Sequence, residues 1–199
     1  MPRGATARLF VAIDPPPAVC EALAEWARAA VAASEGDQQG RPGPAVRVLA
    51  PELMHLTICF LGSRPVGEIS ALAAAVRGCP AEPCQLRLGA PLWLPPRRPH
   101  ALVIAIGDGD GALQRLHERA AGSLADASSW EPERRRFRPH VTVARMPARR
   151  MGGPSGTPLP ATPAGTFSVS VLRLYRSHLS PAGASYEAIA EGAPGSAAV

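Results

Sequence analysis

The chain has 199 residues, 46% of them hydrophobic, and a formal net charge of +5 at pH 7. This length and composition suit a soluble protein with one core and exclude a chain that is disordered throughout. No apolar run approaches the roughly 20 residues that a membrane span requires, and Asp14 and three prolines end the first apolar stretch early. We therefore expect no secretory signal, no membrane association and a cytoplasmic location.

Apolar periodicity and Gly/Pro breaks divide the N-terminal half into short elements. In chain order we expect a strand at residues 8–13, a helix at 18–33, a polar loop at 34–44, strands at 46–49 and 55–61, and a helix at 66–76. The first helix follows Pro17, which the first helical turn tolerates. The second helix begins after Pro65 and ends at Gly78.

The C-terminal half continues the same alternation. We expect strands at 85–88 and 101–106, a helix at 111–124, a strand at 137–145, a Gly/Pro-rich surface loop at 146–165, a strand at 167–174, a turn at 177–180 and a strand at 185–190. Strands and single helices interleave without regular parallel βαβ units, which favours an α+β fold with antiparallel pairing. Residues 1–191 are expected to form a single domain, followed by a frayed tail at 192–199.

Arginine supplies all 21 basic residues, and the charge is uneven. Nine arginines and no acidic residue lie between residues 134 and 186. Guanidinium groups bind phosphate through paired hydrogen bonds, so this bias indicates an anionic ligand or, as the alternative, a solvated basic face.

The four cysteines are interpreted as free thiols or packing residues. Cys79 and Cys84 are spaced slightly too widely for a zinc knuckle, and no second ligand pair lies near them. We expect no metal and no cofactor.

One long-range repeat stands out. The sequence His55-Leu-Thr-Ile in the strand expected at 55–61 returns as His140-Val-Thr-Val in the strand expected at 137–145. Two of five histidines followed by threonine at the same offset would arise in about 1% of random arrangements. Since residues i and i+2 of a strand face the same side, each histidine shares a face with its threonine.

Two such strands suit phosphodiester chemistry. One neutral and one protonated imidazole can act as general base and general acid on opposite sides of a phosphorus atom. Thr57 and Thr142 can donate hydrogen bonds to its non-bridging oxygens. Because the motifs are near twins, the residues alone do not decide which histidine is the acid.

The histidines also allow other interpretations. Two histidines could ligate a metal, but no third ligand stands at a recognisable spacing. A single strand histidine is usually structural, and we assign His100, His117 and His178, which lack the threonine partner, to structural or exposed positions.

These motifs resemble those of the two-histidine phosphoesterase superfamily, and within it the RNA 2′,3′-cyclic phosphodiesterases of bacteria and archaea, once called 2′-5′ RNA ligases. The resemblance covers most of the chain. It rests on the opening strand with Asp14, on Pro51-Glu52 before the first motif and Phe-Leu-Gly after it, on residues 137–145, and on the pattern of Ser177, Leu179, Gly183 and Tyr186. Two departures, Val48 for a common tryptophan and Leu53 for a common asparagine, remove no catalytic group.

The resemblance implies a bilobal α+β fold in which two antiparallel sheets with flanking helices face a central cleft. It implies hydrolysis of a terminal RNA 2′,3′-cyclic phosphate to a 2′-phosphomonoester without a metal. His55 would then be the acid, His140 the base, and Thr57 and Thr142 the phosphate-binding groups.

Two further substrate contacts are candidates. Arg145 would contact phosphate or base, although it alternates to the face opposite His140 unless the strand bulges or ends. Phe10 would stack on the terminal base, with core packing as the alternative.

The expected partner is an RNA with a 2′,3′-cyclic phosphate end, or a related small nucleotide, bound by a monomer without an obligate protein partner. Two rival functions stay open. One is the reverse reaction, 2′-5′ RNA ligation. The other is a non-catalytic module that binds RNA or nucleotides in the same cleft.

Overall fold

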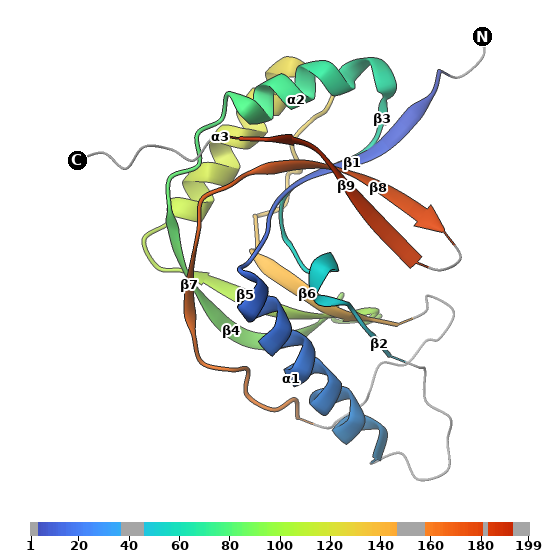
Figure 1. Cartoon of the computed structure of the whole chain (residues 1–199), viewed down its shortest axis with the longest axis vertical. Helices are drawn as coiled ribbons and strands as arrows, with labels where there is room; N and C mark the ends of the chain where they lie inside the picture. Colours follow the sequence, from blue (N-terminus) through green and yellow to red (C-terminus); the bar gives the residue numbers. More distant parts are fainter. Residues whose placement is uncertain (1–3, 37–45, 147–157, 181–182, 193–199) are drawn as a thin grey trace.

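The computed structural model describes residues 4–36, 46–146, 158–180 and 183–192 (Figure 1). Within these ranges the fold is α+β, and all strand pairs are antiparallel. The helices are α1 (Pro17–Gly36), α2 (Ile69–Arg77) and α3 (Ala112–Ala127), with short 3-10 turns η1 (Pro51–Leu53) and η2 (Val66–Glu68). The strands are β1 (Thr6–Ile13), β2 (Arg47–Val48), β3 (Leu56–Pro65), β4 (Cys84–Leu94), β5 (Ala101–Asp108), β6 (His140–Arg145), β7 (Thr166–Val169), β8 (Arg173–Ser180) and β9 (Gly183–Glu191).

The strands form one sheet with the order β7-β4-β5-β6-β3-β1-β8-β9, and β2 pairs with β6 beside this path. A single residue pair, Leu56 with Val141, joins β3 to β6 at the middle. The expectation of two sheets is therefore wrong in its count, because this pair makes the two halves continuous. Strand patterns in a sequence show which face is buried, but they do not show which strands become neighbours at a junction.

The helices occupy two places. The pair α2 and α3 pack on each other, with α3 against β3, β4 and β5 and α2 against β8 and β9. Helix α1 lies apart from them and contacts β2, β6 and η1 (Figure 1). Fully buried leucines from both places, among them Leu23 and Leu113, belong to one continuous core. Burial of each such side chain contributes about 1.5–3 kcal/mol.

Local chemistry explains where α3 begins. The Asp108 carboxylate at the end of β5 accepts hydrogen bonds from the backbone N–H groups of Leu113 (3.1 Å) and Gln114 (2.9 Å). A negative charge at a helix N-terminus satisfies otherwise unpaired donors. Gly111, with φ of +72°, makes the tight turn before the helix.

All three predicted helices are confirmed, with small shifts at their ends, but the strand predicted at 167–174 is wrong. It is two strands, β7 paired with β4 and β8 paired with β1, separated by the buried Leu172. The turn predicted at 177–180 is part of β8, which pairs with β9. The alternation of apolar and polar residues continues through this segment, so the sequence does not show that the chain crosses here from one half of the sheet to the other.

Parts of three predicted segments lie outside the described residues: 37–45 of the first polar loop, 147–157 of the Gly/Pro-rich loop, and 193–199 of the tail. Residues 158–165 contain no helix or strand, and residues 34–36, predicted as loop, continue α1. All four cysteines are buried free thiols. None of the described helices is long and apolar enough to cross a membrane.

Candidate active site

The two His-x-Thr motifs meet where the halves of the sheet join. Leu56 and Val141, the central residues of the motifs, are paired and buried. Because side chains alternate along a strand, the histidine and threonine of each motif lie on the opposite face. The antiparallel register then sets His55 across from Thr142 and Thr57 across from His140. All four side chains are partly exposed.

The two imidazoles are oriented in the same way. The Nδ1 of His55 lies 3.0 Å from the carbonyl oxygen of Leu53, and the Nδ1 of His140 lies 2.8 Å from that of Arg138. A carbonyl oxygen only accepts hydrogen bonds, so each Nδ1 carries a proton and donates it. Proton exchange with a ligand is therefore left to the Nε2 atoms.

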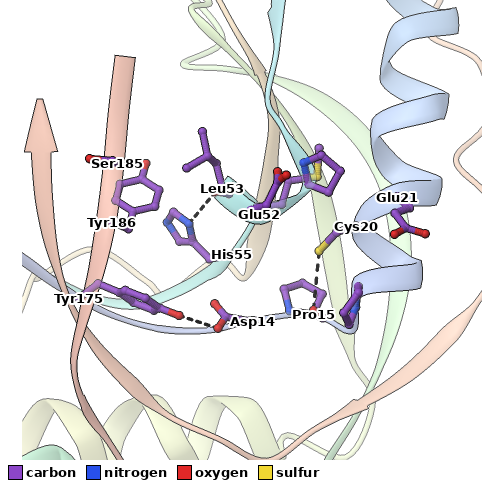
Figure 2. Close-up of a pocket in the computed structure, with 13 residues that line it drawn as sticks. Asp14, Pro15, Cys20, Glu21, Glu52, Leu53, His55, Tyr175, Ser185 and Tyr186 are labelled. Atoms are coloured by element: carbon purple, nitrogen blue, oxygen red, sulfur yellow. Dashed lines mark hydrogen bonds between the residues drawn. The ribbon is translucent and has the colours of Figure 1, made fainter. Parts of the chain in front are cut away.

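Aromatic rings surround His55. Its ring stacks on Phe10, with centroids 4.7 Å apart, and meets the edge of Tyr186 at 5.1 Å. The ring of Phe10 also stacks on Tyr175 at 5.2 Å and is only 4% exposed. Phe10 thus packs against protein rings and holds the imidazole of His55 in place. Figure 2 shows His55 between the backbone of Leu53 and the two tyrosines.

A bulge decides where Arg145 points. The pairing of β6 with β5 shifts by one residue at Val143. An extra residue reverses the alternation of side chains beyond it, which returns Arg145 to the face of His140 and Thr142. Its side chain is exposed. Arg145 therefore lies on the face of the two motifs, as a contact with phosphate or base requires.

Strand β3 has a bulge at the equivalent place, which the sequence pattern does not indicate. Its pairing with β1 shifts at Ile58, so Phe60 returns to the face of Thr57 and is 41% exposed. The Nδ1 of His117 donates to the carbonyl oxygen of Ile58 at 2.9 Å. His117 is therefore structural, as predicted, because it satisfies a backbone group at the bulge.

The environment lowers the pKa of His55 below its ordinary value of 6.5. Burial is the largest cause, since it disfavours the charged ring, and the neighbouring Arg145 and His140 side chains act in the same direction. The hydrogen bond to Leu53 and the carboxylate of Asp14 oppose the shift. These electrostatic effects agree with the register, which sets Arg145 and His140 beside His55.

A cavity of about 570 Å³ opens on the side of His55 (Figure 2). His55, Tyr175 and Tyr186 line it, whereas His140 does not. The Asp14 carboxylate at its edge accepts hydrogen bonds from the Tyr175 hydroxyl and from Arg173, both at 2.6 Å. Space for a bulky ligand group thus exists beside one histidine of the pair.

No group of three His, Cys, Asp or Glu side chains that could hold a metal ion occurs in the described part of the chain. His100 and His178 are exposed, as predicted. His178 lies 3.1 Å from a carboxylate oxygen of Glu187.

Comparison with known proteins agrees with this arrangement. The family model of the 2′-5′ RNA ligase superfamily matches residues 9–180. The chain belongs to this superfamily. Two curated proteins that are similar to this chain are RNA 2′,3′-cyclic phosphodiesterases. That of Aeropyrum pernix is 29% identical, with 78% of this chain and 90% of the relative covered. That of Thermus thermophilus is 30% identical, with 90% and 86% covered.

Solved structures of other proteins share the fold of this chain. LigT of E. coli complexed with phosphate matches with a TM-score of 0.71 at 21% identity, covering 96% of this chain and 99% of LigT. LigT complexed with 3′-AMP matches with a TM-score of 0.70 at 24% identity, covering 94% and 97%. TT0787 of Thermus thermophilus matches with a TM-score of 0.68 at 25% identity, covering 92% and 96%.

Proposed function

We propose that this protein is an RNA 2′,3′-cyclic phosphodiesterase that opens the terminal cyclic phosphate to a 2′-phosphomonoester without a metal ion. The juxtaposition of the two His-Thr pairs across the β3–β6 junction carries the proposal. The activity named for the relatives from Aeropyrum pernix and Thermus thermophilus supports it.

The reaction needs one proton removed and one delivered. The Nε2 of His140 takes a proton from water, whose oxygen attacks phosphorus in line with the 3′ oxygen. The bond from phosphorus to the 3′ oxygen breaks, and that oxygen takes a proton from the Nε2 of His55. The hydroxyls of Thr57 and Thr142 donate to the non-bridging oxygens, where negative charge accumulates.

The cavity supports this division of roles. The departing 3′ oxygen stays on the nucleoside, a bulky group, whereas the attacking water needs little room. Space for a nucleoside lies beside His55, and His140 does not line it. We therefore assign the acid to His55 and the base to His140.

Arg145 and Phe10 have supporting roles in this proposal. Arg145 shares the face of His140 and Thr142 and supplies a charge that balances the phosphate. Phe10 supports the ring of His55, since little of its own surface is left for a base. Of the two sequence-based alternatives for Phe10, the proposal therefore adopts core packing rather than stacking on the terminal base.

The deciding experiment uses an oligoribonucleotide that ends in a 2′,3′-cyclic phosphate. We expect complete conversion to the 2′-phosphate, identified by its resistance to an enzyme that removes only 3′-phosphates. An intact cyclic end, which would favour a binding module, or a 3′-phosphate product would contradict the proposal.

Ligation by a 2′-5′ bond is the second candidate, favoured by the description of the superfamily. It is the same displacement at phosphorus, in which a 5′-hydroxyl attacks in place of water and the bond to the 3′ oxygen breaks. Adding an RNA with a free 5′-hydroxyl to the incubation tests it, and a joined product that accumulates beyond a trace would support it.

The dependence of kcat/KM on pH should be bell-shaped. Its alkaline limb should report His55, because the general acid must be protonated, and the lowered pKa of His55 moves this limb to lower pH than an unperturbed histidine would give. Arg145→Gln removes a cation that disfavours the protonated ring, so it should move the alkaline limb to higher pH. Asp14→Asn removes an anion that favours the protonated ring, so it should move the limb to lower pH. Rate profiles from pH 4 to 9 check this, and shifts of both variants in the same direction would contradict it.

Hydrolysis should also be independent of bound metal. We expect the rate in excess EDTA to stay within about twofold of the untreated rate, because the proposed groups need no metal ion. Loss of activity that added zinc restores would favour a metal-assisted reaction instead.

A further inference from the structure

Two arginines face each other at the rim of the candidate site. Arg47 of β2 is paired directly with Arg145 of β6, and both side chains are exposed. Directly opposite residues project from the same face of a sheet, and like charges placed in this way disfavour the pairing. An anion between or above the two guanidinium groups would be attracted by both of them.

The guanidinium of Arg47 reaches Gly183 at the start of β9. A Cβ atom at Gly183 would lie 3.0 Å from its Nη1 and 3.2 Å from its Nη2. Gly183 has φ of +133°, a conformation that favours glycine, and its missing side chain leaves room for the guanidinium. Arg47 thus spans from β2 to the hairpin of β8 and β9.

This position adjoins two segments that line the cavity beside His55. On one side, β2 leads through Ala50 into residues 51–54, which line the cavity. On the other side, Ser185 and Tyr186 follow Gly183 in β9 and also line it. A ligand group that leaves the cavity between these two walls passes the guanidinium of Arg47.

The charges of the cavity and of its rim are opposite. Three carboxylates line the cavity, those of Glu21, Glu52 and Asp14, the last of which is paired with Arg173, and no arginine is among the described residues that line it. A phosphate group is therefore disfavoured inside the cavity and favoured at the rim, where Arg47 and Arg145 lie.

We propose that Arg47, together with Arg145, binds a second phosphate of the substrate, the one on the 5′ oxygen of the terminal nucleoside. This inference rests on the proposed function, which sets the cyclic phosphate at the histidines and its nucleoside in the cavity. The 5′ oxygen then leaves the cavity at the rim, where the planar guanidinium forms paired hydrogen bonds to phosphate. The enzyme should consequently prefer oligonucleotide ends over cyclic mononucleotides.

Three substrates separate the phosphate from the rest of the chain: adenosine 2′,3′-cyclic phosphate, the same compound with a 5′-phosphate, and the dinucleotide ApA ending in the cyclic phosphate. Arg47→Gln should lower kcat/KM for the second and third by about tenfold or more, because it removes a charge-assisted contact. Turnover of the first should stay within about twofold, which also shows that the variant is folded. Arg77→Gln, which changes an exposed arginine at the end of α2, is the matched control and should leave all three unchanged.

Each outcome decides the inference. Selective loss with the two 5′-phosphorylated substrates supports it, and an equal effect on all three substrates overturns it. If none is hydrolysed, the proposed function fails. The affinities for adenosine 2′-phosphate and adenosine 2′,5′-bisphosphate, measured by calorimetry, then test the second phosphate site. Tighter binding of the bisphosphate that Arg47→Gln abolishes would then still support the second phosphate site. Equal affinities would overturn it.

Discussion

His140→Ala should lower kcat for a cyclic phosphate substrate by about a hundredfold to ten-thousandfold, the usual contribution of a general base. The Nδ1 of His140 donates to the carbonyl oxygen of Arg138, so its Nε2 is the nitrogen that takes the proton from water. The side chain is only partly buried, and its removal should leave the core intact. Initial rates of hydrolysis at saturating cyclic phosphate measure the loss of kcat.

His55→Ala should cause a loss of the same size, although His55 also packs against Phe10 and Tyr186. Thermal unfolding must therefore accompany its kinetics, to separate lost chemistry from lost packing. His178→Ala is the control for both, because His178 is an exposed histidine that pairs with Glu187 on β9. Activity of either active-site variant within threefold of the parent would refute the acid–base assignment.

Thr57→Val and Thr142→Val should each lower kcat/KM by about tenfold to a hundredfold. Valine keeps the β-branched shape that suits a strand, and it removes the hydroxyl that donates to a non-bridging oxygen. The two threonines stand across from opposite histidines, so losses of similar size are expected from the two variants. Steady-state kinetics at the optimum pH provide the measurement.

Serine at each position is the informative companion, because it returns the hydroxyl without the methyl group. Thr57→Ser and Thr142→Ser should recover most of the activity, whereas Thr166→Val, at an exposed position on β7, should have no effect. Valine variants as active as the parent would mean that the threonines only pack in the sheet.

Local patterns were sufficient for much of the fold. The three helices follow from apolar spacing, supported for α1 and α2 by Pro17 and Pro65 near their starts, and β1, β3 and β5 from short apolar runs. The single sheet could not be predicted, since the pairing of Leu56 with Val141 is a tertiary contact between distant segments. The break at Leu172 was hidden for the same reason, because β7 and β8 join different strands.

In the candidate site, too, local features were predictable and features set by tertiary pairing were not. Each histidine and its threonine were predictable because the period of a strand sets them on one face. The face of Arg145 was not, because it depends on a bulge opposite β5. The sequence does not reveal the exposure of Phe60, the position of Arg47 or the cavity, because these depend on the bulge in β3, on the pairing of β2 and on the approach of Arg47 to Gly183.

The central claim is that both histidines act on one phosphorus atom, and a crystal structure of the protein with adenosine 2′-phosphate tests it most directly. We expect the phosphate within hydrogen-bonding distance of the Nε2 atoms of His55 and His140, with both threonine hydroxyls on its oxygens and the adenosine in the cavity beside His55. A phosphate that contacts only one of the two histidines, or binds elsewhere on the protein, would contradict the account.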